Sequence, residues 1–242
     1  MKFRGYAWFL SAIAVMAIAA PAFAQIKIGD PTDPNPPEVN ANCDVTGYKS
    51  FEQVLNPPVA IPDNIPAGVT VGPINTPADG SNINDVVFEI QLAHTWIGDI
   101  VATLLYDSNC DGITDASARV ICRPRGTGTA NVPCGAGLGV GCSSNFVTQN
   151  VIRITDGVGT TLADGTCPGD AVNIPAGCYR TATAGDIGLA FGGRPKGGCW
   201  RLNVSDNAGI DVGTISRWAV HILNSPTANT ASTWGSVKTL YR

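Results

Sequence analysis

The sequence from Gly198 to Leu223, GCWRLNVSDNAGIDVGTISRWAVHIL, reads as two strands on either side of a polar turn. Apolar and polar residues alternate along both arms, which is the two-residue period of a strand with one face in a core. The Asp, Asn and Gly residues between the arms favour turn conformations. Each arm carries one tryptophan, Trp200 or Trp218, and a buried Trp contributes roughly 150–250 Å² of contact area. We therefore predict a β-fold with both indoles in one interior.

Alternation also predicts strands upstream of this stretch. Asp85–His94 and Ile100–Tyr106 are separated by a tight turn at Ile97–Asp99, so we expect them to pair as a hairpin. The segment Phe51–Pro66 contains four prolines, which suit edge or turn positions and exclude a central strand. Helical periodicity is absent outside the N-terminal segment.

The N-terminus has the pattern of a secretory signal peptide. Lys2 and Arg4 precede the apolar run Tyr6–Ala20, and Ala22-Phe23-Ala24 fits a small-residue cleavage site. The alternative is an uncleaved membrane anchor, but the run is short of the roughly 20 residues that a bilayer requires. We expect cleavage after Ala24, and a secreted or periplasmic protein that does not span the membrane once cleaved.

The cysteine content agrees with export. An even number of Cys in an exported chain predicts disulfides, up to four of them here. Zinc is disfavoured because there is no C-x-x-C pair and only two His are present. Connectivity stays open, since eight Cys allow roughly a hundred pairings; the short closures Cys134–Cys142 and Cys167–Cys178 are two hypotheses. The eight are Cys43, Cys110, Cys122, Cys134, Cys142, Cys167, Cys178 and Cys199.

Composition excludes some partners. The net charge of −4 offers no basic surface for nucleic acid or anionic lipid. The 28 Gly, 17 Pro and only 14% charged residues indicate many turns and a β-rich extracellular domain. We expect a signal peptide at 1–24, a Pro-rich leader at 25–50, one domain at 51–224 with a Cys-rich insertion at about 107–197, and a tail at 225–242. The tail is open to three readings: an edge strand, a sorting tag or a partner contact.

Three blocks carry a family resemblance: IPDNIPAGV at Ile61–Val69, HTWIGDIVATLL at His94–Leu105, and CWRLNVSDNAGIDVGTISRW at Cys199–Trp218. In this order they resemble the P domain (P/Homo B domain) of kexin- and furin-like subtilases and of bacterial secreted proteases. The resemblance spans about Phe51 to Leu223, although the Cys-rich middle matches poorly. It implies an all-β, jelly-roll-type β-sandwich, like galactose-binding domains, here with disulfide-stapled loops.

The resemblance also implies a module without catalytic residues. P domains stabilise the adjoining protease and influence its calcium and pH dependence, and we find no protease domain beside this one. A subtilase needs a few hundred residues of its own, and no HExxH motif is present. We expect His94 to be a hydrogen-bonded structural residue and His221 to lie on the outer face of its strand as ordinary surface. The chain is therefore predicted not to be an enzyme.

One candidate calcium site lies in a single loop. Oxygen ligands at positions 1, 3, 5 and 9, with Gly at 6, match the first part of a calcium loop and resemble thrombospondin type 3 repeats. Position 12 is Ala118 instead of the bidentate Glu, and the alternative is a plain turn rich in Asp and Asn. The ligands would be Asp107, Asn109, Asp111 and Asp115.

A second candidate combines Asp99, Asp206 and Asp211, which fall at turns inside the family blocks. Three carboxylates gathered at one end of a sandwich would repel one another unless a cation lies between them. The alternative is that each carboxylate caps backbone amides of its own turn. Calcium is thus the one cofactor that we expect.

These patterns favour a secreted, non-catalytic binding or stabilising module, assisted by calcium, whose partner is a secreted protease or a cell-surface component. One alternative is a component of a subtilisin- or kexin-like serine endopeptidase system. Another is an extracellular carbohydrate- or surface-binding module, with Trp96 as the one aromatic candidate. Architecture alone does not decide between them.

Overall fold

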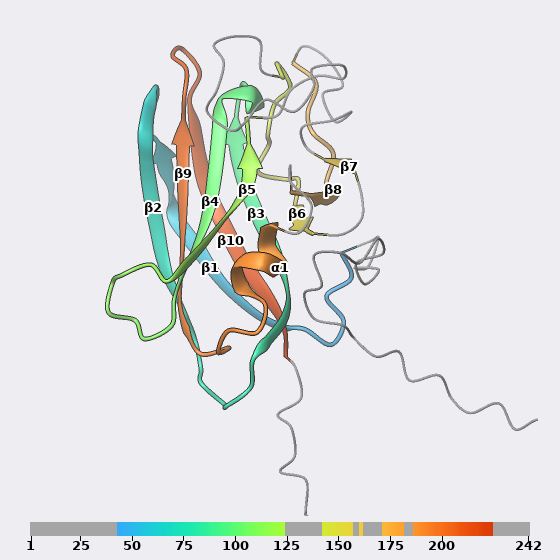
Figure 1. Cartoon of the computed structure of the whole chain (residues 1–242). Helices are drawn as coiled ribbons and strands as arrows, with labels where there is room; N and C mark the ends of the chain where they lie inside the picture. Colours follow the sequence, from blue (N-terminus) through green and yellow to red (C-terminus); the bar gives the residue numbers. More distant parts are fainter. Residues whose placement is uncertain (1–42, 124–141, 157–159, 162–170, 182–185, 225–242) are drawn as a thin grey trace, which may run out of the picture.

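The computed structural model describes residues 43–123, 142–156, 160–161, 171–181 and 186–224, which form two packed β-sheets (Figure 1). The predicted signal peptide and C-terminal tail lie outside these residues. No helix among them is long and apolar enough to cross a membrane. The strands are β1 (Lys49–Ile61), β2 (Ile65–Thr76), β3 (Ile83–His94), β4 (Ile100–Asp107), β5 (Ala116–Cys122), β6 (Ile152–Thr155), β7 (Thr160–Thr161), β8 (Gly177–Arg180), β9 (Gly198–Asp206) and β10 (Gly213–Asn224).

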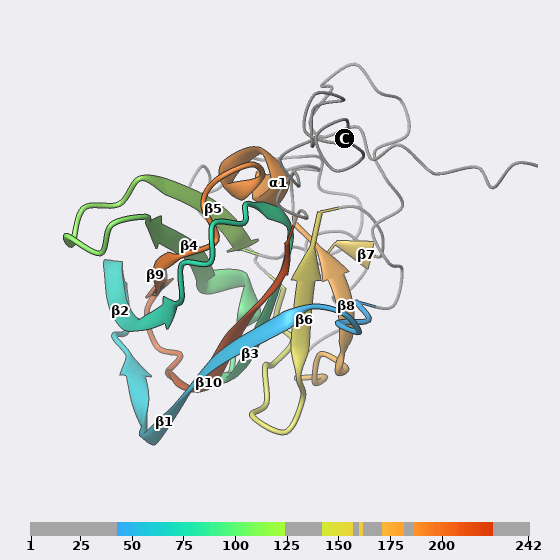
Figure 2. The ribbon, with the colours of Figure 1, turned by 90° about the horizontal axis from the view of Figure 1, so that it is seen from below.

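The topology is that of a jelly roll. One sheet has the order β1-β10-β3-β6-β8-β7 and the other β2-β9-β4-β5. Leaving out β7 and β8, four strands face four, and the chain changes sheet repeatedly as it does in two interlocked Greek keys. Every pair is antiparallel except β6–β8 and β7–β8, which extend the larger sheet beyond the sandwich (Figure 2). The predicted jelly-roll-type β-sandwich is confirmed.

The predicted hairpin between Asp85–His94 and Ile100–Tyr106 is wrong. These segments form β3 and β4, but β3 pairs with β10 and β6, whereas β4 pairs with β9 and β5. A short 3-10 helix at Ile97–Asp99 carries the chain from one sheet to the other. Alternation shows which face of a strand is buried, but it does not identify the neighbouring strand.

The core contains both tryptophans, fully buried as predicted. Trp200 packs against Tyr106 and Phe191, with ring centroids 4.8 and 4.9 Å away. Trp218 donates a hydrogen bond from Nε1 to Gln53 Oε1 over 2.9 Å. The two indoles come from opposite sheets, because Trp200 lies in β9 and Trp218 in β10.

The prolines of the first segment occupy an edge, as expected. β1 and β2 are the outer strands of their sheets, and the pairing of β1 with β10 is interrupted between Val54 and Val59, around Pro57 and Pro58. The interruption removes the need for ladder hydrogen bonds where proline has no N–H to donate.

The Cys-rich insertion is more ordered than its sequence indicates. It contributes β5, β6, β7, β8 and a six-residue helix, α1 (Asp186–Phe191), which we did not predict. Six residues are too few to show a helical period, but Ile187 and Phe191 of α1 are buried in the core. The helix thus closes one open side of the sandwich.

Two disulfides are defined among the described residues, Cys43–Cys178 and Cys110–Cys199. The hypothesis Cys167–Cys178 is therefore wrong: the segment before β1 passes beside β8, which brings the Cα atoms of Cys43 and Cys178 to 5.4 Å. Cys122 and Cys142 are also disulfide-bonded, and the described residues include no free cysteine. Cys134 and Cys167 lie outside the described residues, so the Cys134–Cys142 hypothesis is untested.

Candidate functional site

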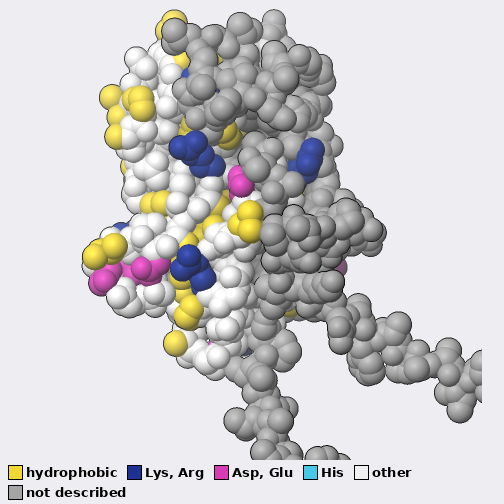
Figure 3. All heavy atoms as spheres, in the orientation of Figure 1, with side chains coloured by type: hydrophobic (Ala, Val, Ile, Leu, Met, Phe, Trp, Pro, Cys, Tyr) yellow, Lys and Arg dark blue, Asp and Glu magenta, His cyan; other side chains and the backbone are white. Residues whose placement is uncertain are grey.

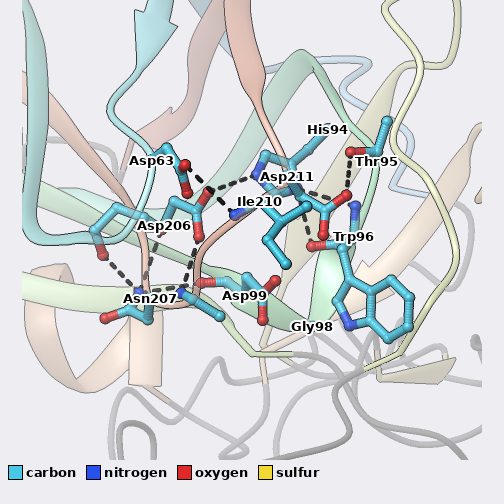
Figure 4. A network of polar contacts seen from close by, with 12 residues as sticks. Asp63, His94, Thr95, Trp96, Gly98, Asp99, Asp206, Asn207, Ile210 and Asp211 are labelled. Atoms are coloured by element: carbon cyan, nitrogen blue, oxygen red, sulfur yellow. Dashed lines mark hydrogen bonds and ion pairs between the residues drawn. The ribbon is translucent and has the colours of Figure 1, made fainter.

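Three connections meet at one end of the sandwich, which we call the His94 end. They are the β1–β2 turn, the crossing between β3 and β4, and the β9–β10 loop. Gly213 of β10 pairs with both Ile61 and His94, and Asp206 of β9 pairs with both Ile65 and Ile100. Each of the three sequence blocks thus contributes to this end (Figure 4).

The centre of the His94 end is a buried His–Asp pair. His94 Nε2 lies 3.0 Å from Asp206 Oδ2, and both side chains are fully buried. His94 Nδ1 lies 2.9 Å from the carbonyl oxygen of Trp96 and 3.1 Å from its amide nitrogen, and Asp206 Oδ1 accepts a hydrogen bond from the amide of Ala208 over 3.1 Å. Both side chains are therefore committed to the fold, as we expected for His94.

The second predicted carboxylate set does gather here. The pKa of Asp99 is raised, mainly by burial and then by the negative charge of Asp206, with a smaller contribution from Asp211. Arg123 lies 3.5 Å from the Asp99 carboxylate, and Asp211 accepts a hydrogen bond from the Thr95 hydroxyl over 2.6 Å.

The Asp99 main chain is tied to the same network, because its carbonyl accepts bonds from the backbone and side-chain nitrogens of Asn207, at 2.9 and 3.1 Å. The carboxylates of Asp99, Asp206 and Asp211 thus each have a protein partner, namely Arg123, His94 and Thr95. Within the described residues, no group of three or more His, Cys, Asp or Glu side chains is arranged to hold a metal ion.

The Asp-rich loop uses its carboxylates in the same way. Asp107 is buried and accepts hydrogen bonds from the amides of Gly112 and Asp111, at 2.8 and 3.3 Å. The guanidinium of Arg201 lies 3.2 Å from Asp107 Oδ2, and it also donates to the Gly112 carbonyl over 3.1 Å. Arg201 thus places a positive charge beside Asp107, the first ligand of the predicted calcium loop, and a calcium ion there would have to displace it.

The remaining candidate ligands cap the turn. Asp111 accepts from the amide of Ile113 over 2.8 Å and from Asn109 Nδ2 over 3.0 Å. Asp115 accepts from the amide and hydroxyl of Ser108 at 2.8 and 2.5 Å, which lowers the pKa of Asp115. Ala118 lies in β5, paired with Leu104, so position 12 of the supposed loop is part of the sheet.

A second polar cluster, which sequence reasoning missed, covers the outer face of the larger sheet. Glu89 is almost completely buried and binds Arg153 Nε at 2.6 Å and the guanidinium of Arg217. Burial raises the pKa of Glu89, but contacts with His221, Arg153 and Arg217 outweigh it and lower the pKa to about 2. Arg217 also binds Glu52 at 2.6 Å. The available signal was a Glu with the apolar run Val86–Phe88 before it and Ile90 after it in β3.

His221 belongs to this cluster, so its prediction as ordinary surface is wrong: only 4% of the residue is exposed. Its Nδ1 lies 2.7 Å from Ser50 Oγ and its Nε2 lies 3.3 Å from Glu89 Oε2. The order hydroxyl, imidazole, carboxylate is that of a catalytic triad. However, Nε2 makes no hydrogen bond of acceptable geometry, and two arginines already hold the carboxylate. We interpret the cluster as an ion network that fastens four strands together, β1, β3, β6 and β10.

Comparison with known protein families finds no match for this chain, and comparison with curated proteins finds none either. Among solved structures, the chain shows a weak similarity to the crystal structure of an Aeromonas sobria serine protease (ASP) in complex with the chaperone ORF2. The sequences are 12% identical, the TM-score is 0.36, and the match covers 74% of this chain. It covers 26% of that chain, so the present chain spans about a quarter of it.

Proposed function

We propose that this chain is a secreted, non-catalytic module of the P-domain type that binds and stabilises a secreted protease. The observation that carries the proposal is the convergence of the three resembling blocks. They are far apart in sequence, yet they meet at one buried network. His94 of β3 and Asp206 of β9 form its central pair, and the β1–β2 turn lies beside that pair. The resemblance thus falls on residues that build one end of the fold together.

The burial of both histidines supports a non-catalytic role. A general base must reach the proton that it removes. The His94 side chain is fully buried against Asp206 and the Trp96 backbone, and His221 is held between Ser50 and Glu89. The disulfides are compatible with an extracellular location.

The test uses the secreted mixture in which such a protease would occur. The mature protein, residues 25–242, is immobilised and incubated with culture supernatant of the cells that secrete it, and bound serine hydrolases are labelled with a fluorophosphonate. We expect a labelled protease that is retained by the folded protein and not by a reduced, alkylated sample. We also expect it to lose activity more slowly on warming when the mature protein is added.

Two results would contradict the proposal. If no labelled protease is retained, or if a retained protease is inactivated equally fast with and without the module, the accessory role is wrong. Label on the module itself would instead favour the alternative that the chain takes part in proteolysis directly.

A further inference from the structure

The two ends of the described sandwich differ in what they offer to a partner. Lys49, at the start of β1, pairs with Ile222, near the end of β10, so the chain enters and leaves the fold at one end. The β9–β10 loop and the β1–β2 turn lie at the opposite, His94 end (Figure 1). The described chain therefore begins and ends at the side of the sandwich opposite the His94 end.

Three aliphatic side chains are exposed at the His94 end. Ile210 is 95% exposed, Val212 is 65% exposed and Ile65 is 46% exposed. Ile210 and Val212 lie in the β9–β10 loop, and Ile65 pairs with Asp206 at the base of that loop. Figure 3 shows hydrophobic side chains at the upper end of the molecule, where these connections lie. We call Ile65, Ile210 and Val212 the apolar tip.

The backbone conformation of Ile210 is a second sign, besides exposure, that the tip is a binding surface. Its φ angle is 96°, a left-handed value that is a genuine outlier for a β-branched residue. Glycine adopts such a conformation without steric cost. Since Ile210 is almost wholly exposed, its side chain adds no burial that offsets the strain. Folding therefore does not account for isoleucine here, and strain of this kind is retained at binding sites.

Carboxylates flank the tip. Asp63, in the β1–β2 turn, accepts a long hydrogen bond from the amide of Ile210 (3.4 Å), and Asp211 is bonded to the Thr95 hydroxyl. No Lys or Arg of the described residues forms an ion pair with either carboxylate (the nearby Arg123 pairs with Asp99). Figure 4 shows Asp63 and Asp211 on either side of Ile210. The tip thus combines exposed apolar surface with two carboxylates that no Lys or Arg of the described residues neutralises.

We propose that the apolar tip docks a protein segment in which an apolar side chain is flanked by Lys or Arg. Apolar contact with the aliphatic side chains would supply affinity, and the opposite charges beside it would set the register and the rate of encounter. The inference rests on the proposed accessory role and deepens it by naming the surface that meets the partner.

The probes are three synthetic peptides of equal length, titrated to millimolar concentration into the ¹⁵N-labelled mature protein. The first has a Leu-Phe-Leu centre flanked by Arg, the second has Glu in place of Arg, and the third keeps Arg but has Ser in the centre. We expect amide shifts confined to residues 61–65 and 207–213 with the first peptide, and affinities about tenfold weaker for the other two. Equal binding of all three, shifts elsewhere, or no shift would overturn the proposal.

Variants separate binding from folding. Ile210→Gly should weaken binding of the first peptide by about tenfold without lowering the melting temperature, because glycine relieves the strained φ. Leu189→Ala is the matched control, since Leu189 is 74% exposed on α1, away from the tip. Asp63→Asn with Asp211→Asn should weaken binding while leaving the fold intact. Unchanged affinity in Ile210→Gly would overturn the proposal.

Phosphatidylcholine vesicles form a further arm, because exposed aliphatic residues can also enter a lipid surface. Binding to vesicles that is lost in Ile210→Gly, without binding to the basic peptide, would overturn the proposed protein partner. A different experiment tests the accessory role, which is wrong if the module neither retains nor stabilises a secreted protease. The two can therefore be judged separately.

Discussion

His94 and Asp206 are in contact through Nε2 and Oδ2 at 3.0 Å, although 112 positions separate them in the chain. His94 ends β3 of the larger sheet, and Asp206 ends β9 of the smaller one. The pair therefore joins the two layers of the sandwich at the end where the β9–β10 loop leaves. Because both side chains are fully buried, removing either one leaves a polar group without water or partner.

Replacing Asp206 tests this inter-sheet contact. Asp206→Ala should lower the free energy of unfolding by about 3 kcal/mol, because His94 Nε2 and the Ala208 amide both lose their acceptor. Urea denaturation followed by Trp fluorescence measures the change. Asp63→Ala, at an exposed turn, is the control and should change stability by less than about 0.5 kcal/mol. Equal effects of the two substitutions would show that the pair contributes nothing.

The ion network of Glu89 predicts loss of stability in acid. Its pKa is lowered from 4.5 to about 2, so its contribution is complete above the unfolded pKa and is lost as the pH falls from 4.5 toward 2. Glu89→Gln should remove this dependence and cost roughly 2 kcal/mol at neutral pH, since both arginines remain partly exposed. Unfolding curves between these pH values measure it, with Glu52→Gln as the exposed control.

Asp156 predicts a change of the opposite sign. Burial raises its pKa from 3.8 to about 6, although the amides of Gly188 and Ile187 donate to its carboxylate. The folded state therefore holds the proton more tightly, and stability should fall as the pH rises from 3.8 through 6, by at most about 1.4 kcal/mol per pH unit. Asp156→Asn should abolish this slope. A slope that persists in Asp156→Asn has another origin.

Calcium binding stays a prediction, and the contact between Arg201 and Asp107 provides a specific way to test it. If the Asp107 loop binds calcium with a Kd of about 1 mM, as extracellular modules do, then roughly 10 mM calcium should stabilise the protein by about 1.4 kcal/mol. Arg201→Met should increase the stabilisation, because the cation no longer competes with the guanidinium at Asp107. Thermal melts with calcium and with chelator measure it. No shift in either protein would exclude calcium at this loop.

The sequence was sufficient for the fold class and for the buried residues. The two-residue period correctly indicated strands at Asp85–His94 and Gly198–Leu223 and the burial of Trp200 and Trp218. It did not indicate which strands are neighbours, because a period of two describes one strand at a time. The predicted β3–β4 hairpin failed for this reason. The Cys167–Cys178 hypothesis failed because Cys178 is bonded to Cys43, which lies 135 residues away in the sequence. Only the arrangement of the strands brings these two cysteines together.

The candidate sites were predictable in part. The three sequence blocks predicted that Asp99, Asp206 and Asp211 gather at one end, and the structure brings them together there beside His94. The partners that neutralise the carboxylates were not predictable, since Arg201 reaches Asp107 from another strand. His221 was misjudged for a related reason: it lies on the outer face, but polar residues of adjacent strands surround it.

The most direct test of the central claim, that this sandwich has no reaction centre, is the hydrolysis of a fluorogenic peptide library by the purified mature protein. In parallel, mass spectrometry after fluorophosphonate treatment looks for an adduct on each serine, including Ser50, whose hydroxyl contacts His221. We expect a rate of hydrolysis equal to that of buffer and no adduct on any serine. Hydrolysis that disappears in His221→Gln or His94→Gln, or an adduct on Ser50, would contradict it.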